Sequence, residues 1–85
     1  MPYIKKNKRD EMKGLINALS DQIGGMPGNL NYVITKLVLN SMPQKPTYFN
    51  YNEMVGVLEC AKQEFYRRAA VPYEKNKIDE NGDVY

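Results

Sequence analysis

Two adjacent arginines and an excess of tyrosine are the features of this sequence best suited to chemistry. Guanidinium groups pair with phosphates and carboxylates, and Arg67-Arg68 follows Tyr66 directly. Tyrosine accounts for seven of the 85 residues, against two Phe and no Trp, and its ring can stack on a base while its hydroxyl stays hydrated. The combination favours an anionic nucleotide as ligand. The candidate ligand-binding residues are Tyr32, Lys36, Tyr66, Arg67, Arg68 and Tyr73.

Simpler interpretations exist for Arg68 and for the tyrosines. Glu64 precedes Arg68 by four residues, which is the order that forms an ion pair within a helix. Arg67 has Gln63 at the corresponding position, so the spacing gives it no such partner. The tyrosines equally suit the margins of a small core, where an amphipathic ring is half-buried.

Catalytic groups are scarce. Histidine is absent, which removes the commonest general base and metal ligand, and the single Cys60 falls within a predicted helix. Asp79, Glu80 and Asp83 surround Asn81-Gly82 without the spacing of a calcium-binding loop. The sequence therefore predicts a non-enzymatic protein with no catalytic residue, no metal site and no cofactor.

Three segments carry apolar residues at three- and four-residue spacing, which is typical of amphipathic helices. The first starts near Asn7 and stops at Gly24-Gly25, because paired glycines end helices. The second is expected to start from a cap at Asn29 and to end near Ser41, before Pro43 and Pro46.

The third segment is the longest. Asn50 and Glu53 have the spacing of a capping box, and Pro72 is expected to end this helix. Beyond it, Asn81-Gly82 predicts a type I′ β-hairpin, which could pack on the helices or pair with Tyr3-Ile4. The predicted fold is mainly α: one three-helix domain over residues 1–85 with a short C-terminal β-hairpin, paired in one alternative with the N-terminal segment.

Such a short chain buries little core, so we expect a homo-oligomer. Tyr32 and Leu39 project away from the apolar stripe of the second helix. Gly56 and Cys60 form a strip of small side chains opposite the stripe of the third, and we expect subunits to meet there.

The charge pattern bears on partners and location. Five basic and two acidic residues in 1–14 contrast with two basic and four acidic residues in 74–85. The net charge of +2 ranks nucleic acid below the other partners. No stretch reaches the length of a membrane span, and one cysteine fits a reducing cytoplasm.

Several strings of the sequence are familiar as a set. They are Leu30–Leu37 (LNYVITKL), Gly56–Lys62 (GVLECAK), Glu64–Arg68 (EFYRR), Pro72–Glu74 (PYE) and Glu80–Tyr85 (ENGDVY). The set, with the Met1–Ile4 start, resembles a family of small uncharacterised proteins of tailed phages and bacteria. The resemblance brings no functional residues with it. It implies an accessory protein that acts by binding, in the cytoplasm of the host cell if it is phage-encoded.

These observations lead to two hypotheses. The first is a phage-type accessory protein that counters host defence by sequestering an anionic nucleotide signal in a homo-oligomer. The alternative is a protein–protein adaptor or inhibitor of a host factor, which would use the patch around Tyr32 and Leu39.

Overall fold

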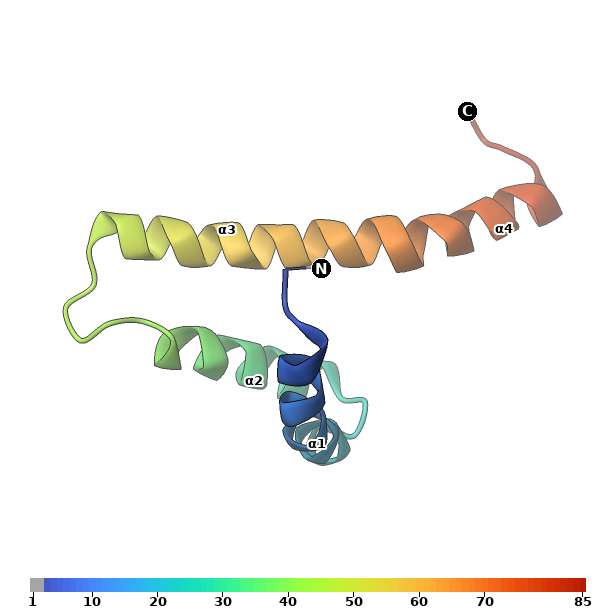
Figure 1. The fold of residues 1–85 in the computed structure, drawn as a ribbon. Helices are drawn as coiled ribbons and strands as arrows, with labels where there is room; N and C mark the ends of the chain where they lie inside the picture. The colour runs from blue at the N-terminus through green and yellow to red at the C-terminus, as the bar shows by residue number, and fades with distance from the viewer. Residues whose placement is uncertain (1–2) are drawn as a thin grey trace. The chain divides into compact units, whose positions relative to one another are not determined.

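The computed structural model describes residues 3–85, which form helices and their connections (Figure 1). The elements are α1 (Lys6–Ile23), α2 (Pro27–Asn40), α3 (Tyr48–Phe65), the π-helical segment η1 (Tyr66–Ala70) and α4 (Val71–Asn81). The chain divides into two compact units, Met1–Gln44 and Lys45–Tyr85. The interpretation of residues 1–85 as one domain stays a prediction.

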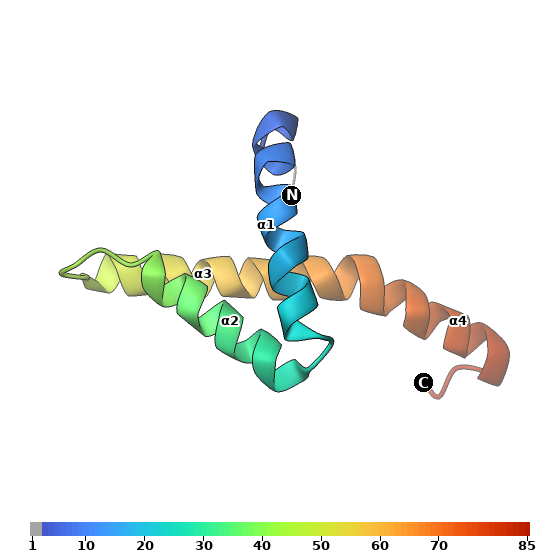
Figure 2. The same cartoon turned by 90° about the horizontal axis from the view of Figure 1, so that it is seen from below.

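The first unit is a pair of helices joined by a glycine turn. Gly24 and Gly25 have φ of 61° and 73°, a left-handed backbone that costs glycine little. The Gly24 N–H donates to the Ser20 carbonyl at 3.1 Å, and the Asn29 side-chain amide donates to the Ile23 carbonyl at 3.1 Å. The predicted end of the first helix is thus confirmed, and Figure 2 shows α1 and α2 diverging from this turn.

The second helix begins earlier than predicted. It starts at Pro27 rather than after Asn29, because proline suits the first turn of a helix, where no N–H is needed. Asn29 serves the end of α1 instead. The predicted end near Ser41 is confirmed, and the Ser41 hydroxyl donates to the Leu37 carbonyl at 2.8 Å.

The third helix also begins earlier than predicted. Thr47 is its N-cap, and Asn50 is the third residue of the helix. The Asn50 side-chain oxygen accepts from the Thr47 N–H at 2.9 Å, so Asn50 takes the role that the sequence analysis gave to Glu53. The helix does begin with a capping box, but the box is Thr47–Asn50 and lies three residues before the predicted Asn50–Glu53.

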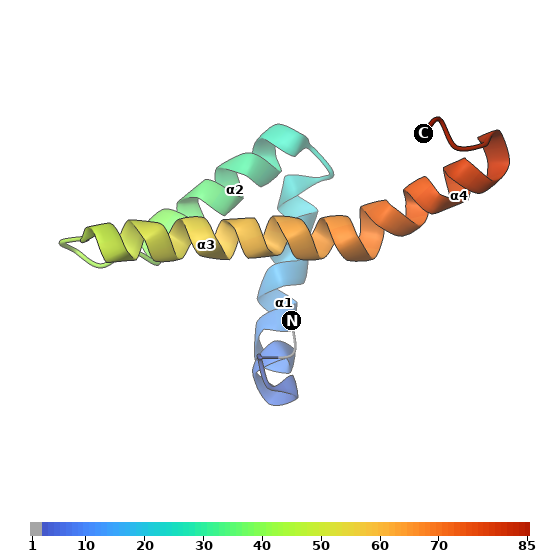
Figure 3. The same cartoon turned by 90° about the horizontal axis from the view of Figure 1, so that it is seen from above.

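Pro72 does not end this helix, contrary to prediction. α3 continues through η1 into α4, and Figure 3 shows the ribbon changing direction there. A proline in a helix offers no N–H and its ring clashes with the carbonyl four residues back. Just before it, the Val71 N–H donates to the Tyr66 carbonyl five residues back. The wider π turn makes room for the proline ring, so the helix bends instead of stopping.

The predicted β-hairpin is wrong. Residues 3–85 contain no strand, neither at Tyr3-Ile4 nor in the tail. Gly82 has φ 85° and its N–H donates to the Ile78 carbonyl at 2.8 Å, closing the last turn of α4. An Asn-Gly pair fits a hairpin turn and a helix C-terminus equally well, and here it ends a helix.

None of the described side chains is fully buried. The most covered residues are the half-buried Leu19, Ile23, Val33, Val38, Met42, Asn50, Met54, Glu64 and Ala70. The apolar stripes are present along the helices as predicted, but no core forms from them within either unit. No helix among the described residues is long and apolar enough to cross a bilayer.

Candidate functional site

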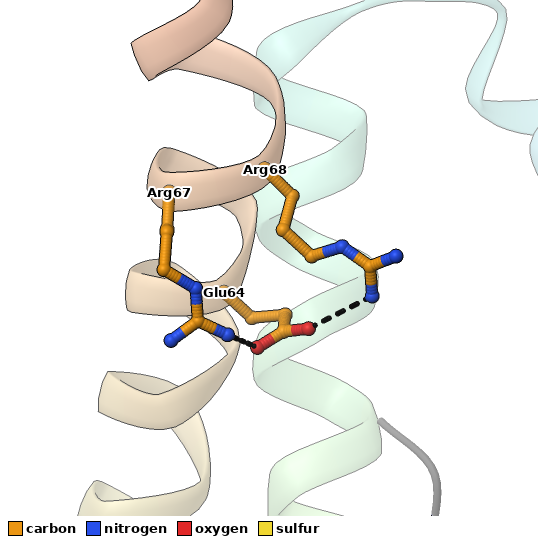
Figure 4. A network of polar contacts seen from close by, with 3 residues as sticks. All are labelled: Glu64, Arg67 and Arg68. Carbon is orange, nitrogen blue, oxygen red and sulfur yellow. Dashed lines mark hydrogen bonds and ion pairs between the residues drawn. The ribbon is translucent and has the colours of Figure 1, made fainter.

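The densest cluster of polar contacts lies where α3 meets η1. Glu64 accepts hydrogen bonds from two arginines, from Arg67 on one oxygen and from Arg68 at 3.1 Å on the other. Figure 4 shows both guanidinium groups directed at the same carboxylate. The Glu64 side chain is 24% exposed, whereas the arginine side chains are 70% and 69% exposed. Glu64 is therefore shielded while both guanidinium groups face solvent.

The electrostatics of this cluster follow from its contacts. The hydrogen bond from Arg68 and the positive charge of Arg67 lower the pKa of Glu64 below its ordinary value. Because the carboxylate stays ionised and arginine stays protonated at neutral pH, the three side chains carry a net charge of +1.

The two arginines bear out one expectation and correct another. Arg68 forms the predicted ion pair with Glu64 four residues earlier. Arg67 was expected to lack a partner on its helix, but it pairs with Glu64 three residues earlier. Residues three apart are also neighbours on a helix, and the sequence analysis considered only the spacing of four.

Two of the predicted tyrosines lie on either side of Pro72. The Tyr66 hydroxyl lies 3.3 Å from both carboxylate oxygens of Glu74. The Tyr73 ring has the Lys77 ammonium 5.6 Å from its centroid, within range of a cation–π interaction. Glu74 and Lys77 were missed by the sequence analysis. Lys77 could have been found from its spacing of four from Tyr73. The Tyr66–Glu74 contact spans eight residues across the π turn of η1, so helical spacing does not predict it.

The remaining two predicted residues lie elsewhere. Tyr32 and Lys36 are one turn apart on α2, in the other unit. Tyr32 is 63% exposed and lines a shallow groove beside the glycine turn with Leu19, Ile23 and Val33. The structure thus gathers Tyr66, Arg67, Arg68 and Tyr73 on the long helix, whereas Tyr32 and Lys36 belong to the other unit.

A comparison with protein families assigns the chain to one of them. The family described as a domain of unknown function (DUF6899) has a model that matches residues 1–84. The chain belongs to this family. No curated protein and no solved structure matches it.

A second carboxylate of the DUF6899 chain has a similar local setting. The hydrogen bond from Gln63, and the charge of Lys62, lower the pKa of Glu59. Cys60 beside it is exposed. Across residues 3–85, no three acidic or cysteine side chains come together as metal ligands would. The cluster around η1 combines the cationic Arg67 and Arg68 and the rings of Tyr66 and Tyr73 with the carboxylates of Glu64 and Glu74.

Proposed function

We propose that this DUF6899 chain is a non-enzymatic, cytoplasmic interaction protein of the phage accessory type, which acts as a homo-oligomer. The observation that carries this proposal is the exposure of its apolar side chains. Leu30, Leu37 and Leu39 on α2 are 46%, 54% and 58% exposed, and Phe65 on α3 is 70% exposed. Side chains of this kind are stable in water when another surface covers them.

The composition of α2 points the same way. Lys36 is its only charged residue among 14, and apolar side chains lie on opposite sides of the helix, as with Leu37 and Leu39. A helix that is apolar on most sides is stable when it is enclosed.

Sedimentation equilibrium of the full chain at micromolar concentration tests the proposal. We expect a mass of two or more copies, each of 9.8 kDa. A mass near 9.8 kDa at every concentration would refute it.

A second candidate function is the sequestration of an anionic nucleotide, as a counter-defence activity. The net positive charge of the Glu64–Arg67–Arg68 cluster, with both guanidinium groups exposed, favours it. Tyr66 and Tyr73 are the nearby rings of the same unit, at 51% and 63% exposure.

Thermal unfolding with a panel of cyclic and linear nucleotides tests this candidate. A ligand at 100 times its Kd stabilises the folded state by about 2.7 kcal/mol. We expect R67A/R68A to lose that stabilisation and K13A/K45A, which removes two lysines elsewhere, to retain it. Equal responses of the two variants, or no response of the wild type at millimolar nucleotide, would contradict it.

The adaptor hypothesis rests on a separate surface. Tyr32 and Leu39 are 63% and 58% exposed on one side of α2, and a host protein could cover them. A stoichiometric partner recovered by the wild-type chain and lost by Y32A/L39A would support this role, and equal recovery by both would contradict it.

A further inference from the structure

The apolar face of α3 has the spacing of a helix that pairs with another helix. Its residues alternate at steps of three and four along the chain. They are Tyr51, Met54, Leu58, Ala61 and Phe65, which we call the α3 stripe. Tyr51, Leu58 and Phe65 are 56%, 41% and 70% exposed. This alternation keeps one seam facing a partner over two heptads.

We propose that the α3 stripe packs antiparallel against the α3 stripe of a second copy. The proposal rests on the proposed homo-oligomer and names its interface. The sequence analysis expected subunits to meet at Gly56 and Cys60, on the assumption that the α3 stripe is covered within its own domain. Within the unit Lys45–Tyr85 the stripe is exposed, so the long helix of that unit does not cover it.

The area of the stripe is sufficient for a small specific interface. Val55 and Val57 flank it at 63% and 55% exposure, and they extend the apolar surface on both sides. With aromatic side chains of about 150–250 Å² each, the stripe and its flanks offer about 500 Å² per copy. A pair therefore buries about 1,000 Å², the lower limit for a specific interface.

The shapes of the side chains set the direction of the pair. With Leu58 of one copy opposite Ala61 of the other, every large residue meets a smaller or more flexible one, and Phe65 meets Met54. Alternation of large and small residues fills an interface well, and a thioether beside an aromatic ring is favourable. A parallel pair would instead place Ala61 opposite Ala61 and Phe65 opposite Phe65. The alanine layer would then be underfilled and the phenylalanine layer overfilled.

The charges agree with this direction. Arg68 occupies the next position of the same spacing, three residues after Phe65. In the antiparallel pair it lies opposite residues 51–53 of the second copy, where the Tyr51 ring and the exposed Glu53 carboxylate are available to it. In a parallel pair Arg68 would face Arg68, and like charges in direct opposition are unfavourable.

Sedimentation of two charge-adding variants of the full chain tests the location of the interface. L58D places a carboxylate in the α3 stripe, and C60D places one on the Gly56–Cys60 side of the same turn. We expect L58D to raise the Kd for self-association by about 100-fold or more, since two leucines leave the interface. C60D adds a carboxylate four residues before Glu64, so it disturbs the helix itself at least as much as L58D does. We nevertheless expect C60D to associate like the wild type.

Disulfide formation tests the direction, on a C60S background. In the antiparallel pair, residue 54 of one copy faces residue 65 of the other. The two copies of residue 65 lie about 16 Å apart along the helix axis, which is too far for a disulfide. We expect a mixture of M54C and F65C chains to form the mixed disulfide and neither variant alone to form its own dimer.

The outcomes separate this interface from the proposed function. A monomeric wild type overturns both. An oligomeric wild type in which L58D associates normally, or in which C60D alone dissociates, overturns the α3 stripe and leaves the homo-oligomer standing. Disulfide dimers of F65C with itself overturn the antiparallel direction. Should L58D lose its helices by circular dichroism, the disulfide result decides.

Discussion

The two units of this chain respond in opposite ways to residues that interrupt helices. In the first unit, Gly24 and Gly25 end α1 and reverse the chain, and the half-buried Leu19, Ile23 and Val33 gather beside the turn. In the second unit, the helix continues past Pro72. The preceding turn, in η1, spans five residues between N–H and carbonyl instead of four.

The difference also sets what stabilises each unit. Beside the glycine turn, Leu19 and Ile23 of α1 line one groove with Tyr32 and Val33 of α2. The long helix relies on local contacts instead, namely ion pairs such as Glu64–Arg68 and the Tyr66–Glu74 hydrogen bond. Exposed contacts of this kind contribute little individually, so a helix held by them depends on a partner to cover its apolar face.

Replacing Pro72 tests the contrast most strongly. In P72A the preceding turn no longer has to make room for a proline ring, so η1 should become regular α-helix. Since an interior proline costs up to about 3 kcal/mol, amide exchange across residues 66–76 should slow by up to about 100-fold. Unchanged exchange rates would show that Pro72 does not cause the π turn.

Replacing Gly24 should weaken the first unit. Its φ of 61° costs an alanine about 1–2 kcal/mol, so G24A should lower the free energy of unfolding by that amount in urea titration. Gly14 is the control, because it lies within α1 with open space around it, and G14A should raise stability by about 0.5–1 kcal/mol. Changes of the same sign in both variants would mean that the turn does not depend on the left-handed glycine.

Removing the Tyr66 hydroxyl tests whether local contacts reinforce η1. Y66F deletes the hydrogen bond to Glu74 and should reduce stability by less than about 1 kcal/mol, with faster exchange confined to residues near η1. Faster exchange throughout α3 would contradict a local role.

Acid should produce the smallest effect. The folded-state pKa of Glu64 is lowered, so its contribution to stability is complete above the ordinary pKa of 4.5 and is lost as the pH falls through the lowered pKa. Helix content by circular dichroism should therefore decline slightly below about pH 4.5. E64Q should show less of this decline than the wild type, and an identical decline in both would contradict the assignment.

The sequence predicts well which segments form helices. It predicts poorly where a helix begins, bends or ends at a proline or an Asn-Gly pair. The glycine turn and the end of α2 follow from backbone chemistry that few residues control, and both were predicted correctly. The errors occur where one residue type serves two structures: Pro27 starts a helix, Pro72 bends one, and Asn81-Gly82 caps one.

The candidate site shows a similar division. The spacing of four between Glu64 and Arg68 predicted their ion pair. Finding the partner of Arg67 needed the spacing of three as well, and finding the partner of Tyr66 needed knowledge of the π turn. The absence of a core in either unit could not be read from the apolar stripes, because their periodicity records which face is apolar and not what covers it.

Helix content measured on dilution tests most directly whether copies cover one another's apolar faces. The account predicts that ellipticity at 222 nm falls together with the sedimenting mass between micromolar and nanomolar chain, because short helices without a partner are marginal in water. Constant ellipticity at a mass near 9.8 kDa over the whole range would contradict it.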